Sequence, residues 1–457
     1  MVIISVTIGI FGGVFAVAVM NGAIEQRLDA ALNTELGHIQ ISRPDFRENF
    51  DIHLRLDSIT NLDKKILELN GVEAVTHRTI ISAMANTATK STGVQVIGID
   101  PVQDKQVFSL GDKLIPGTGS YFADSNKRNP VYIGEDLAKE LNIIRYVIAP
   151  ATIDSLRNRD VPETVLSKLD GYQGRRFRNQ ASFTDALKDT LTKKEASKYG
   201  RKITEEAWSF RTRTRLTLTF LDRNNVQTGG MFRVAGIYDI KNKMYESSHV
   251  FVKNSDIGRL TGLGNEAFHK AVIRIGDIEQ TRNITRQISE NFPDLEVRSW
   301  KEISPEMAMM NDMVEQFYIV FMIIILAALA FGIVNTMLMV VLERTKELGM
   351  LTAIGMNKKR VFRMIMTESV FLSLIGGVTG MIISWGIIAL TSRNGINFVK
   401  YGEGFEAMGF SAHIYPDISI TFFIIVTILI VVTGILSSIY PALKALRLDP
   451  ADALRTE

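Results

Sequence analysis

The fold is decided by one uncharged stretch of sequence, FYIVFMIIILAALAFGIVNTMLMVVL, which runs from Phe317 to Leu342. A helix that crosses the hydrocarbon core of a bilayer needs roughly 20 consecutive apolar residues, because each residue advances the helix by about 1.5 Å. This stretch contains no Asp, Glu, Lys or Arg, and Asn335 is its most polar member. It is therefore predicted to span a membrane rather than to lie inside a soluble domain.

Three further stretches have the same apolar character. Together with the first they place membrane-spanning helices at residues 1–24, 317–342, 364–390 and 418–443. Residues 1–24 could also be a secretory signal peptide, but they lack a positively charged start and their apolar core is long. A retained helix is therefore favoured, and a cytosolic flank missing from this chain would account for the absent basic residues.

Basic residues in the short loops predict the orientation, because cytosolic loops are enriched in Lys and Arg. The segment 391–417 has only Arg393 and Lys400, whereas two other segments, 343–363 and the tail 444–457, are basic: Arg344, Lys346, Lys358, Lys359, Arg360, Arg363, Lys444, Arg447 and Arg455. These two segments are predicted to be cytosolic. Residues 25–316 and 391–417 then lie outside the cytosol, and both termini lie inside.

Two helical stalks are predicted to join the membrane to the outer domain. Apolar residues continue at helical spacing beyond the first span up to Leu36, and they recur before the second span after Pro305. Two stalks that enter one domain would couple its movements to the membrane. The residues that we select as stalk and cargo-cavity candidates are Met20, Leu28, Leu32, Met307, Met310 and Val314.

Between the stalks the pattern is mixed α and β. Helices are predicted over residues 59–69, after Gly134-Glu-Asp136, and over 278–291. A hairpin is predicted from the runs 216–220 and 231–237, with its turn at Thr228-Gly-Gly230. The remaining predicted strands are 94–99, 131–133, 249–252, 271–275 and 295–297.

A basic region interrupts this rhythm between Arg145 and Arg215, where 16 Lys or Arg stand against 9 Asp or Glu. It could dock an acidic partner or anionic headgroups, but a solvated insertion is the favoured interpretation. The candidate partner-docking residues are Arg175, Arg176 and Arg178 in this insertion, and Asn224 and Gln227 near the predicted hairpin turn.

No catalytic or cofactor motif is present. The chain has no cysteine, no phosphate-binding loop of the Gly-x-x-x-x-Gly-Lys-Ser/Thr type and no Gly-x-Ser-x-Gly elbow. Its six histidines show no His-x-x-x-His spacing. A net charge of +3 gives no reason to expect nucleic acid. We therefore expect no enzyme activity, no metal and no directly bound cofactor.

The segment that suggests a mechanism follows the second span. Charged and apolar residues interleave from Glu343 to Gly355, which is typical of a short amphipathic helix on the membrane surface. Such a helix could simply anchor the chain at the interface, or it could receive force from a soluble partner. The candidate coupling residues are Glu343, Arg344, Lys346, Glu347, Leu348, Gly349, Leu351, Ala353 and Gly355.

These motifs resemble a known family. Glu343-Arg-Thr-Lys-Glu-Leu-Gly349 with Ala353-Ile-Gly355, and the ending from Tyr440-Pro-Ala to Arg455, are similar to the MacB, FtsX and LolC/LolE group of ABC transporter permeases. Val19-Met-Asn-Gly22 is similar to LolC and LolE. Gly134-Glu-Asp-Leu-Ala138 and Phe232-Arg-Val-Ala-Gly-Ile237 resemble the MacB-type periplasmic core. The likeness covers most of the chain except the basic insertion.

The resemblance implies a bacterial inner-membrane protein with four transmembrane helices and a large α+β extracytoplasmic domain, of MacB periplasmic core type, between helices 1 and 2. It implies a permease dimer of like or unlike subunits and a separate cytosolic ATPase that uses the ATP. Movement passes to the periplasm by mechanotransmission, and residues 343–355 would seat the coupling helix on that ATPase. Membrane lipids and a periplasmic carrier or adaptor are further expected partners.

Within this family the chain is closest to LolC/LolE, which pass lipoproteins to a carrier, because no ATPase domain is fused to it. The expected cargo is a lipoprotein or another amphiphile. LolC docks its carrier through a hairpin that bears a proline, and residues 222–231 contain none. The alternatives are MacB-like export of peptides, antibiotics or other amphiphiles, and an FtsX-like regulator of a cell-wall hydrolase that transports nothing.

Overall fold

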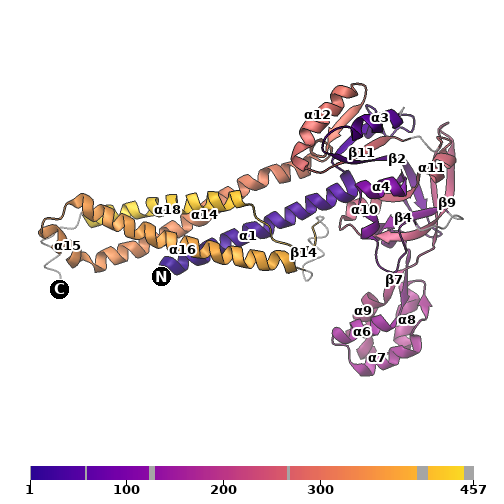
Figure 1. Cartoon of the computed structure of the whole chain (residues 1–457). Coiled ribbons are helices and arrows are strands. Elements are labelled where there is room, and N and C mark those ends of the chain that lie inside the picture. The colour runs from indigo at the N-terminus through magenta and orange to yellow at the C-terminus, as the bar shows by residue number, and fades with distance from the viewer. Residues whose placement is uncertain (1, 57–58, 123–128, 265–267, 399–409, 447–457) are drawn as a thin grey trace. The chain divides into compact units, whose positions relative to one another are not determined.

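The computed structural model describes residues 2–56, 59–122, 129–264, 268–398 and 410–446. The chain divides into two compact units. The helical unit comprises residues 1–29 and 305–457, and the outer unit comprises residues 30–304. Figure 1 shows both units and labels many of their helices and strands.

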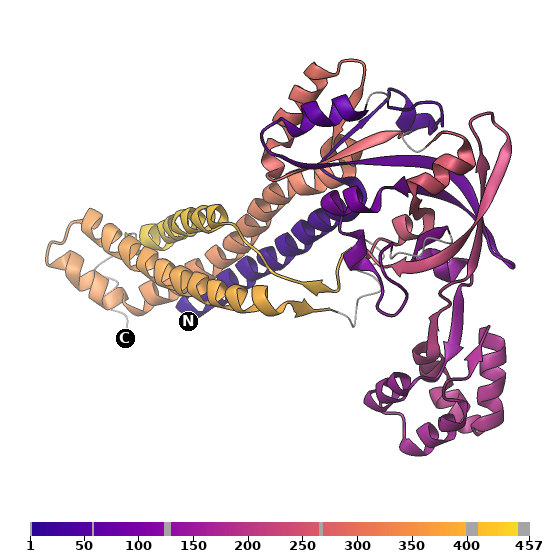
Figure 2. The same ribbon diagram turned by 45° about the vertical axis from the view of Figure 1, so that its right-hand side comes forward.

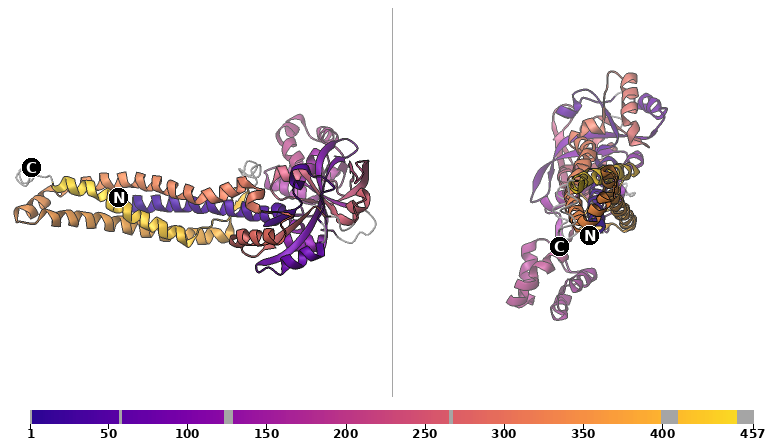
Figure 3. Two further views of the ribbon diagram at one scale, coloured as in Figure 1. Left: turned by 90° about the horizontal axis from the view of Figure 1, so that it is seen from above. Right: turned by 90° about the vertical axis from the view of Figure 1, so that its left-hand side faces the viewer.

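Four long apolar helices make up most of the helical unit: α1 (Val2–Ala31), α14 (Pro305–Glu343), α16 (Lys358–Asn394) and α18 (Ile420–Leu446). Each is long and apolar enough to cross a membrane, and they lie side by side in Figure 3. Helical structure continues beyond the apolar spans at both places where a stalk was predicted. The first helix continues to Leu36 through a π-helical turn, η1 (Leu32–Leu36), and α14 begins at Pro305.

Small residues allow these helices to approach one another closely. A Cβ atom added to Gly9 would lie 2.7 Å from Leu329 of α14. On α16, a Cβ atom at Gly376 would lie 2.9 Å from Val6, and one at Gly380 would lie 2.8 Å from a backbone oxygen of α1. A larger side chain at these positions would force the helices apart. These glycines therefore serve close packing within the helical unit.

The outer unit is built on a nine-stranded sheet of order β12-β1-β11-β2-β3-β10-β4-β9-β8, and β2 also pairs with β8. This extra pairing closes the strands from β2 to β8 into a barrel. The strands are β1 (Ile39–Ser42), β2 (Val72–Asn86), β3 (Ser91–Ile99), β4 (Pro130–Gly134), β8 (Arg215–Leu221), β9 (Gln227–Tyr238), β10 (His249–Lys253), β11 (Lys270–Ile275) and β12 (Glu296–Ser299).

Alternate residues of the barrel strands fill its interior, because successive side chains of a strand point to opposite faces. Val96, Val131, Leu216, Phe232 and Val250 are all fully buried in this core. The predicted strands at 94–99, 131–133, 249–252, 271–275 and 295–297 are confirmed by this sheet. The alternation of apolar and polar residues along the chain therefore predicted these strands correctly.

Helices cover the sheet: α2 (Phe46–Asn49), α3 (Ile59–Leu67), α4 (Pro101–Val107), α5 (Glu135–Glu140), α10 (Lys243–Ser248), α11 (Asn254–Thr261), α12 (Thr281–Asn291) and α13 (Trp300–Ile303). The three predicted helices are confirmed as α3, α5 and α12. Asp100 ends β3 and caps α4, because its side chain accepts hydrogen bonds from the backbone N–H groups of Val102 and Gln103.

The longest strand, β2, was not predicted from the sequence. Its middle is polar, from Thr76 to Thr79, yet all four of these side chains are buried. Arg78 forms a buried ion pair with Asp104, with 2.9 Å between Nε and Oδ1, and its guanidinium lies 3.6 Å from the centre of the Phe108 ring. Polar residues can be buried when partners elsewhere in the chain pair with them. A strand that contains such residues lacks the apolar alternation by which strands are predicted, so β2 was missed.

The predicted hairpin exists, but its turn was placed wrongly. The turn occupies residues 222–226, where Asn225 has a φ of 58° and Asp222 N donates to Val226 O. The Gly229-Gly230 pair, which indicated a turn, lies within β9. A Cβ atom at Gly229 would lie 2.5 Å from Leu218 O of β8, so glycine serves close strand approach here rather than a turn.

The basic insertion is a folded subdomain of the outer unit, seen in Figure 2. It contains the helices α6 (Pro150–Asn158), α7 (Glu163–Leu169), α8 (Gln180–Thr190) and α9 (Lys193–Ala207). They pack with a three-stranded sheet of order β6-β5-β7, formed by Arg176–Phe177, Ile144–Val147 and Trp208–Phe210. Its own apolar core includes Leu156, Phe183 and Ile203. The insertion is solvated on its charged surface, but the charge count did not predict this core.

Candidate functional site: the coupling segment and the stalk ends

The predicted coupling segment forms a short helix between α14 and α16. This helix, α15 (Thr345–Ala353), follows α14 after Arg344. It is followed by Gly355, whose φ of +102° favours glycine. Asn357 then caps α16 by accepting a hydrogen bond from Lys359 N at 2.9 Å. Each end of the connection is therefore fixed by a local signal in the sequence.

The helix α15 has an inner and an outer side. Leu348 and Gly349 are buried, and Leu348 packs on the core of the helical unit. Leu351 is half-buried, and the side chain of Ala353 lies outside the described residues. Its outer side has the exposed residues Lys346, Glu347 and Met350. The flanking residues Glu343, Arg344, Ile354 and Gly355 are exposed as well. Charges that flank exposed apolar side chains suit the docking of a protein partner.

An ion pair ties the start of this segment to α16. Arg344 Nη1 lies 3.2 Å from Glu368 Oε1, and both side chains are more than one-third exposed. Exposed pairs contribute little to stability, so the contact orients the segment more than it stabilises the protein.

The first stalk ends in several polar contacts within the outer unit. Leu32 and Glu35 of η1 are buried, and Glu35 Oε2 accepts a hydrogen bond from Asn242 Nδ2 at 2.8 Å. The backbone oxygen of Asn33 accepts one from Ser109 N at 2.9 Å. The end of the helix is thus attached to the segments that precede α10 and follow α4. Of the other stalk candidates on α1, Leu28 is buried and Met20 is exposed.

The chain enters and leaves the outer unit on neighbouring strands. β1 follows the first stalk, β12 precedes the second, and the two pair antiparallel with Ile39 opposite Ser299. Trp300, which is buried, donates its backbone N–H to His38 O at 2.9 Å. Arg47 also donates to the backbone oxygen of Ile303. The chain segments that follow the first stalk and precede the second therefore pair in one sheet.

The second stalk is the start of α14. Met307, Met310 and Val314 are all half-buried, and Val314 packs against the core of the helical unit. α14 is a single helix of 39 residues, which corresponds to a length of about 58 Å. One continuous rod therefore joins the exit from the outer unit to the coupling segment.

The connection between α16 and α18 contacts α1 around Gly22, well before that helix ends. It contains the small strands β13 (Ile396–Asn397) and β14 (His413–Ile414). Asp417 N donates to Ala18 O at 3.1 Å, and Asn21 Nδ2 donates to Asp417 O at 3.4 Å. A Cβ atom on Gly22 would lie 2.1 Å from Tyr415 O, so only glycine permits this approach. The sequence singled out Val19-Met-Asn-Gly22 but not its partner.

The two predicted docking sets lie in different places in the outer unit. Arg176 and Arg178 are exposed, while Arg175 lies 5.5 Å from the ring centre of Tyr172 and 5.2 Å from that of Phe177. Asn224 and Gln227 are exposed at the tip of the β8–β9 hairpin. Exposed apolar side chains surround this tip, and an open groove beside it is lined by residues that include Leu221, Met84 and Gly93.

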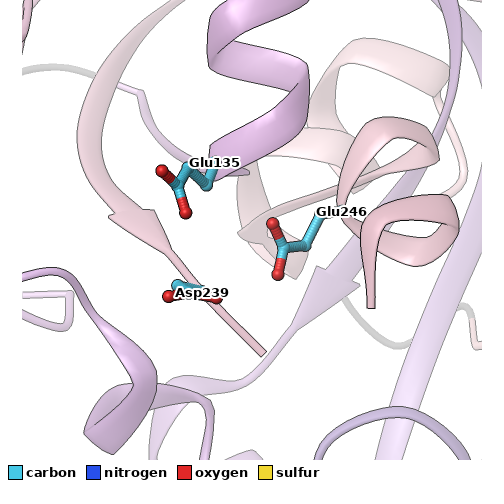
Figure 4. Close-up of side chains that lie close together, drawn as sticks. All are labelled: Glu135, Asp239 and Glu246. Atoms are coloured by element: carbon cyan, nitrogen blue, oxygen red, sulfur yellow. The ribbon is translucent and has the colours of Figure 1, made fainter. Parts of the chain in front are cut away.

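Three carboxylates that the sequence did not single out meet near the barrel, and Figure 4 shows them. Oxygen atoms of Glu135, Asp239 and Glu246 all lie within 4.8 Å of one another. Glu135 pairs with Lys139 at 2.9 Å and Asp239 with Lys241 at 2.6 Å. These partners neutralise the two half-buried members, so the cluster has little charge left for a metal ion.

Glu246 is the buried member of this cluster. Its Oε1 accepts hydrogen bonds from the backbone N–H groups of Ile240, at 2.8 Å, and Lys241, at 3.0 Å. Burial raises its pKa to about 8, and these hydrogen bonds only partly oppose that rise. A carboxyl that holds its proton near neutral pH is a weak metal ligand. The three side chains come from α5, the end of β9 and α10, which only the folded sheet brings together.

Family comparisons match both ends of the chain. Residues 1–152 match the MacB-like periplasmic core domain, and residues 319–450 match the FtsX-like permease C-terminal domain. The chain therefore carries one domain of each type, in the order that the resemblance of its motifs implied. The C-terminal motif from Arg447 onward lies outside the described residues.

The chain is also similar to curated permeases. It is 36% identical over 126 residues to the pyoverdine export ATP-binding/permease protein PvdT of Pseudomonas entomophila, which covers 28% of this chain and 16% of that protein. It is 28% identical over 233 residues to the macrolide export ATP-binding/permease protein MacB of Escherichia coli. That alignment covers 49% of this chain and 34% of MacB. It is 29% identical over 237 residues to an uncharacterized ABC transporter permease of Methanocaldococcus jannaschii. That alignment covers 50% of this chain and 55% of the relative. The chain thus spans about half or less of each relative.

Proposed function

We propose that this chain is the permease subunit of an ABC transporter that works by mechanotransmission in a bacterial inner membrane. A separate cytosolic ATPase would bind the outer side of α15, and a second permease subunit would complete the transporter. The observation that carries the proposal is α14, because this single helix begins at Pro305, a few residues after β12 in the chain, and continues without a break to Glu343 at the coupling segment. The domain matches support a permease of the MacB and FtsX type.

The cargo that we propose is a lipoprotein, which is released from the inner membrane toward a periplasmic carrier. The support is the motif Val19-Met-Asn-Gly22, whose glycine allows the loop before α18 to touch α1. Whether the carrier docks on this subunit depends on the hairpin tip at residues 222–226, which has no proline.

A second candidate cargo is a small amphiphile. PvdT and MacB, by their names, export pyoverdine and macrolides, and both are similar to this chain. Under this proposal the same movement of the outer unit would push cargo toward a periplasmic adaptor rather than a lipoprotein carrier.

One experiment separates the two cargoes. The chain is depleted in its native host, and outer-membrane lipoproteins are followed by membrane fractionation. Retention of lipoproteins in the inner membrane supports lipoprotein release. Normal sorting, together with increased sensitivity to amphiphilic antibiotics, would favour small-molecule export. Normal sorting with unchanged sensitivity would contradict both transport proposals and leave a regulator of the FtsX type.

A further inference from the structure

The small sheet of the 144–210 subdomain has two unlike faces. Tyr146 of β5 and Phe177 of β6 stand opposite each other in the register and are buried in the subdomain core. Neighbouring residues of a strand point to opposite faces, so Arg145 and Arg176 share the other face. Arg176 stands opposite Val147, which places Arg145 diagonally across from it.

A third arginine joins this face from β7. Ser209 stands opposite Arg145 in the register, and Arg145 Nε donates to Ser209 Oγ at 3.1 Å. Arg211 follows two residues later, and its backbone N–H continues the ladder by donating to Ile143 O at 3.0 Å. Because residues two apart lie on the same side of a strand, Arg211 shares the face with the other two.

The arginine ion pairs described in this subdomain are made by other residues. Arg157 and Arg159 of the same subdomain each form ion pairs with two acidic residues. In the part of the chain that the structure describes, no such pair involves Arg145, Arg176 or Arg211. Partial burial lowers the pKa of Arg145, and the charges of Arg176 and Arg211 lower it further. Like charges held this close repel one another, so a bound anion relieves the repulsion.

We propose that Arg145, Arg176 and Arg211 form a docking face for an extended acidic segment of a partner protein. Diagonal neighbours on adjacent strands lie about 7–8 Å apart. In an extended segment, alternate residues lie about 6.6–6.8 Å apart on one side. Alternating Asp or Glu residues therefore match the spacing of the arginines, and each guanidinium can hold one carboxylate through two parallel hydrogen bonds.

A phosphate group fits this face less well. One phosphate is too small to reach three guanidinium groups that are spread along diagonals of about 7–8 Å. The docking face also differs from the set selected from the sequence, because Arg175 stacks on its own aromatic neighbours. The proposal does not depend on the transport cycle, because the face belongs to a subdomain with a core of its own.

The test measures binding of a fluorescent peptide of alternating Glu and Thr to the purified full chain in neutral detergent. The variant combines Arg145→Gln, Arg176→Gln and Arg211→Gln. A matched control removes the same charge from the exposed start of α9, through three lysine-to-glutamine changes at Lys193, Lys194 and Lys198. Unchanged thermal unfolding of both variants verifies that they fold. A second variant with lysine at the three arginine positions retains the charge and removes the paired hydrogen bonds.

We expect the glutamine variant to bind the peptide about tenfold more weakly, because three ion pairs at the protein surface are lost. The lysine variant should lie between it and the unchanged chain, and the α9 control should bind normally. Equal binding by the glutamine variant would overturn the proposal, and so would equal weakening by the α9 control. Arginine-dependent binding of inorganic phosphate or phosphatidylglycerol vesicles without binding of the peptide would replace it with a phosphate site.

Discussion

Substitution of Gly22 by alanine should detach the loop before α18 from α1. The added Cβ atom would lie 2.1 Å from Tyr415 O, 2.9 Å from its carbonyl carbon and 3.0 Å from Asp417 N. All three atoms belong to the backbone, so no rotation of a side chain can relieve the contact. The loop must move away, and the hydrogen bond from Asp417 N to Ala18 O is lost.

The size of this effect follows from three contributions. Overpacking costs about 1–3 kcal/mol, and the lost hydrogen bond costs about 1 kcal/mol. Alanine in place of glycine stabilises a helix by about 1 kcal/mol. The net destabilisation of the closed loop is therefore about 1–3 kcal/mol. This corresponds to a roughly 5- to 150-fold loss of the protection of the Asp417 amide against hydrogen exchange.

Hydrogen exchange of the Asp417 amide in the detergent-solubilised protein measures this quantity directly. The matched control is Gly12→Ala on the same helix, where a Cβ atom would meet nothing within 4 Å. That control should leave the protection of Asp417 unchanged. If Gly22→Ala also leaves it unchanged, the close approach of the loop to α1 is refuted.

Three further predictions concern the coupling segment, the stalk and the acidic cluster. Replacing Glu343 and Glu347 by lysine should release the ATPase or abolish its stimulation, as measured by co-purification and ATP turnover; unchanged turnover would remove the assignment. Leu28→Asp puts a charge at a buried position and should reduce transport far more than membrane insertion, whereas full transport would show that the stalk is not under packing constraint. Burial raises the pKa of Glu246 to about 8 from 4.5, so the folded protein keeps this proton where the unfolded chain has lost it, and stability should fall as pH rises from about 4.5 to 8. Glu246→Gln should remove this dependence and stabilise the protein at pH 9 by a few kcal/mol in thermal unfolding, with little difference at pH 4.5; a constant difference across this range would contradict the assignment.

The sequence predicted the parts of the fold in which local pattern and environment agree. The four apolar helices, the continuation of the first helix to Leu36 and the start of α14 at Pro305 follow from apolar spacing and a single proline. Strands with alternating apolar residues, such as β3, were found for the same reason. The domain order followed from motifs that the family comparisons then matched.

The sequence failed where distant contacts override the local pattern. β2 was missed because Arg78 is buried against Asp104, a partner that the chain pattern does not identify. The hairpin turn was misplaced because Gly229 looks like a turn residue but serves the approach of β8. The partner of Gly22 lies almost 400 residues away, at Tyr415. Only the folded chain brings such groups together.

The central claim is that α14 carries force across the membrane, from a cytosolic coupling segment to an outer unit. Because the chain has no cysteine, single cysteines at the exposed positions Met350 and Lys198 can report the side of the membrane on which each lies. A membrane-impermeant maleimide is applied to spheroplasts before and after permeabilisation. The account predicts labelling of position 198 in intact spheroplasts and of position 350 only after permeabilisation. Labelling of both positions from the same side would contradict it.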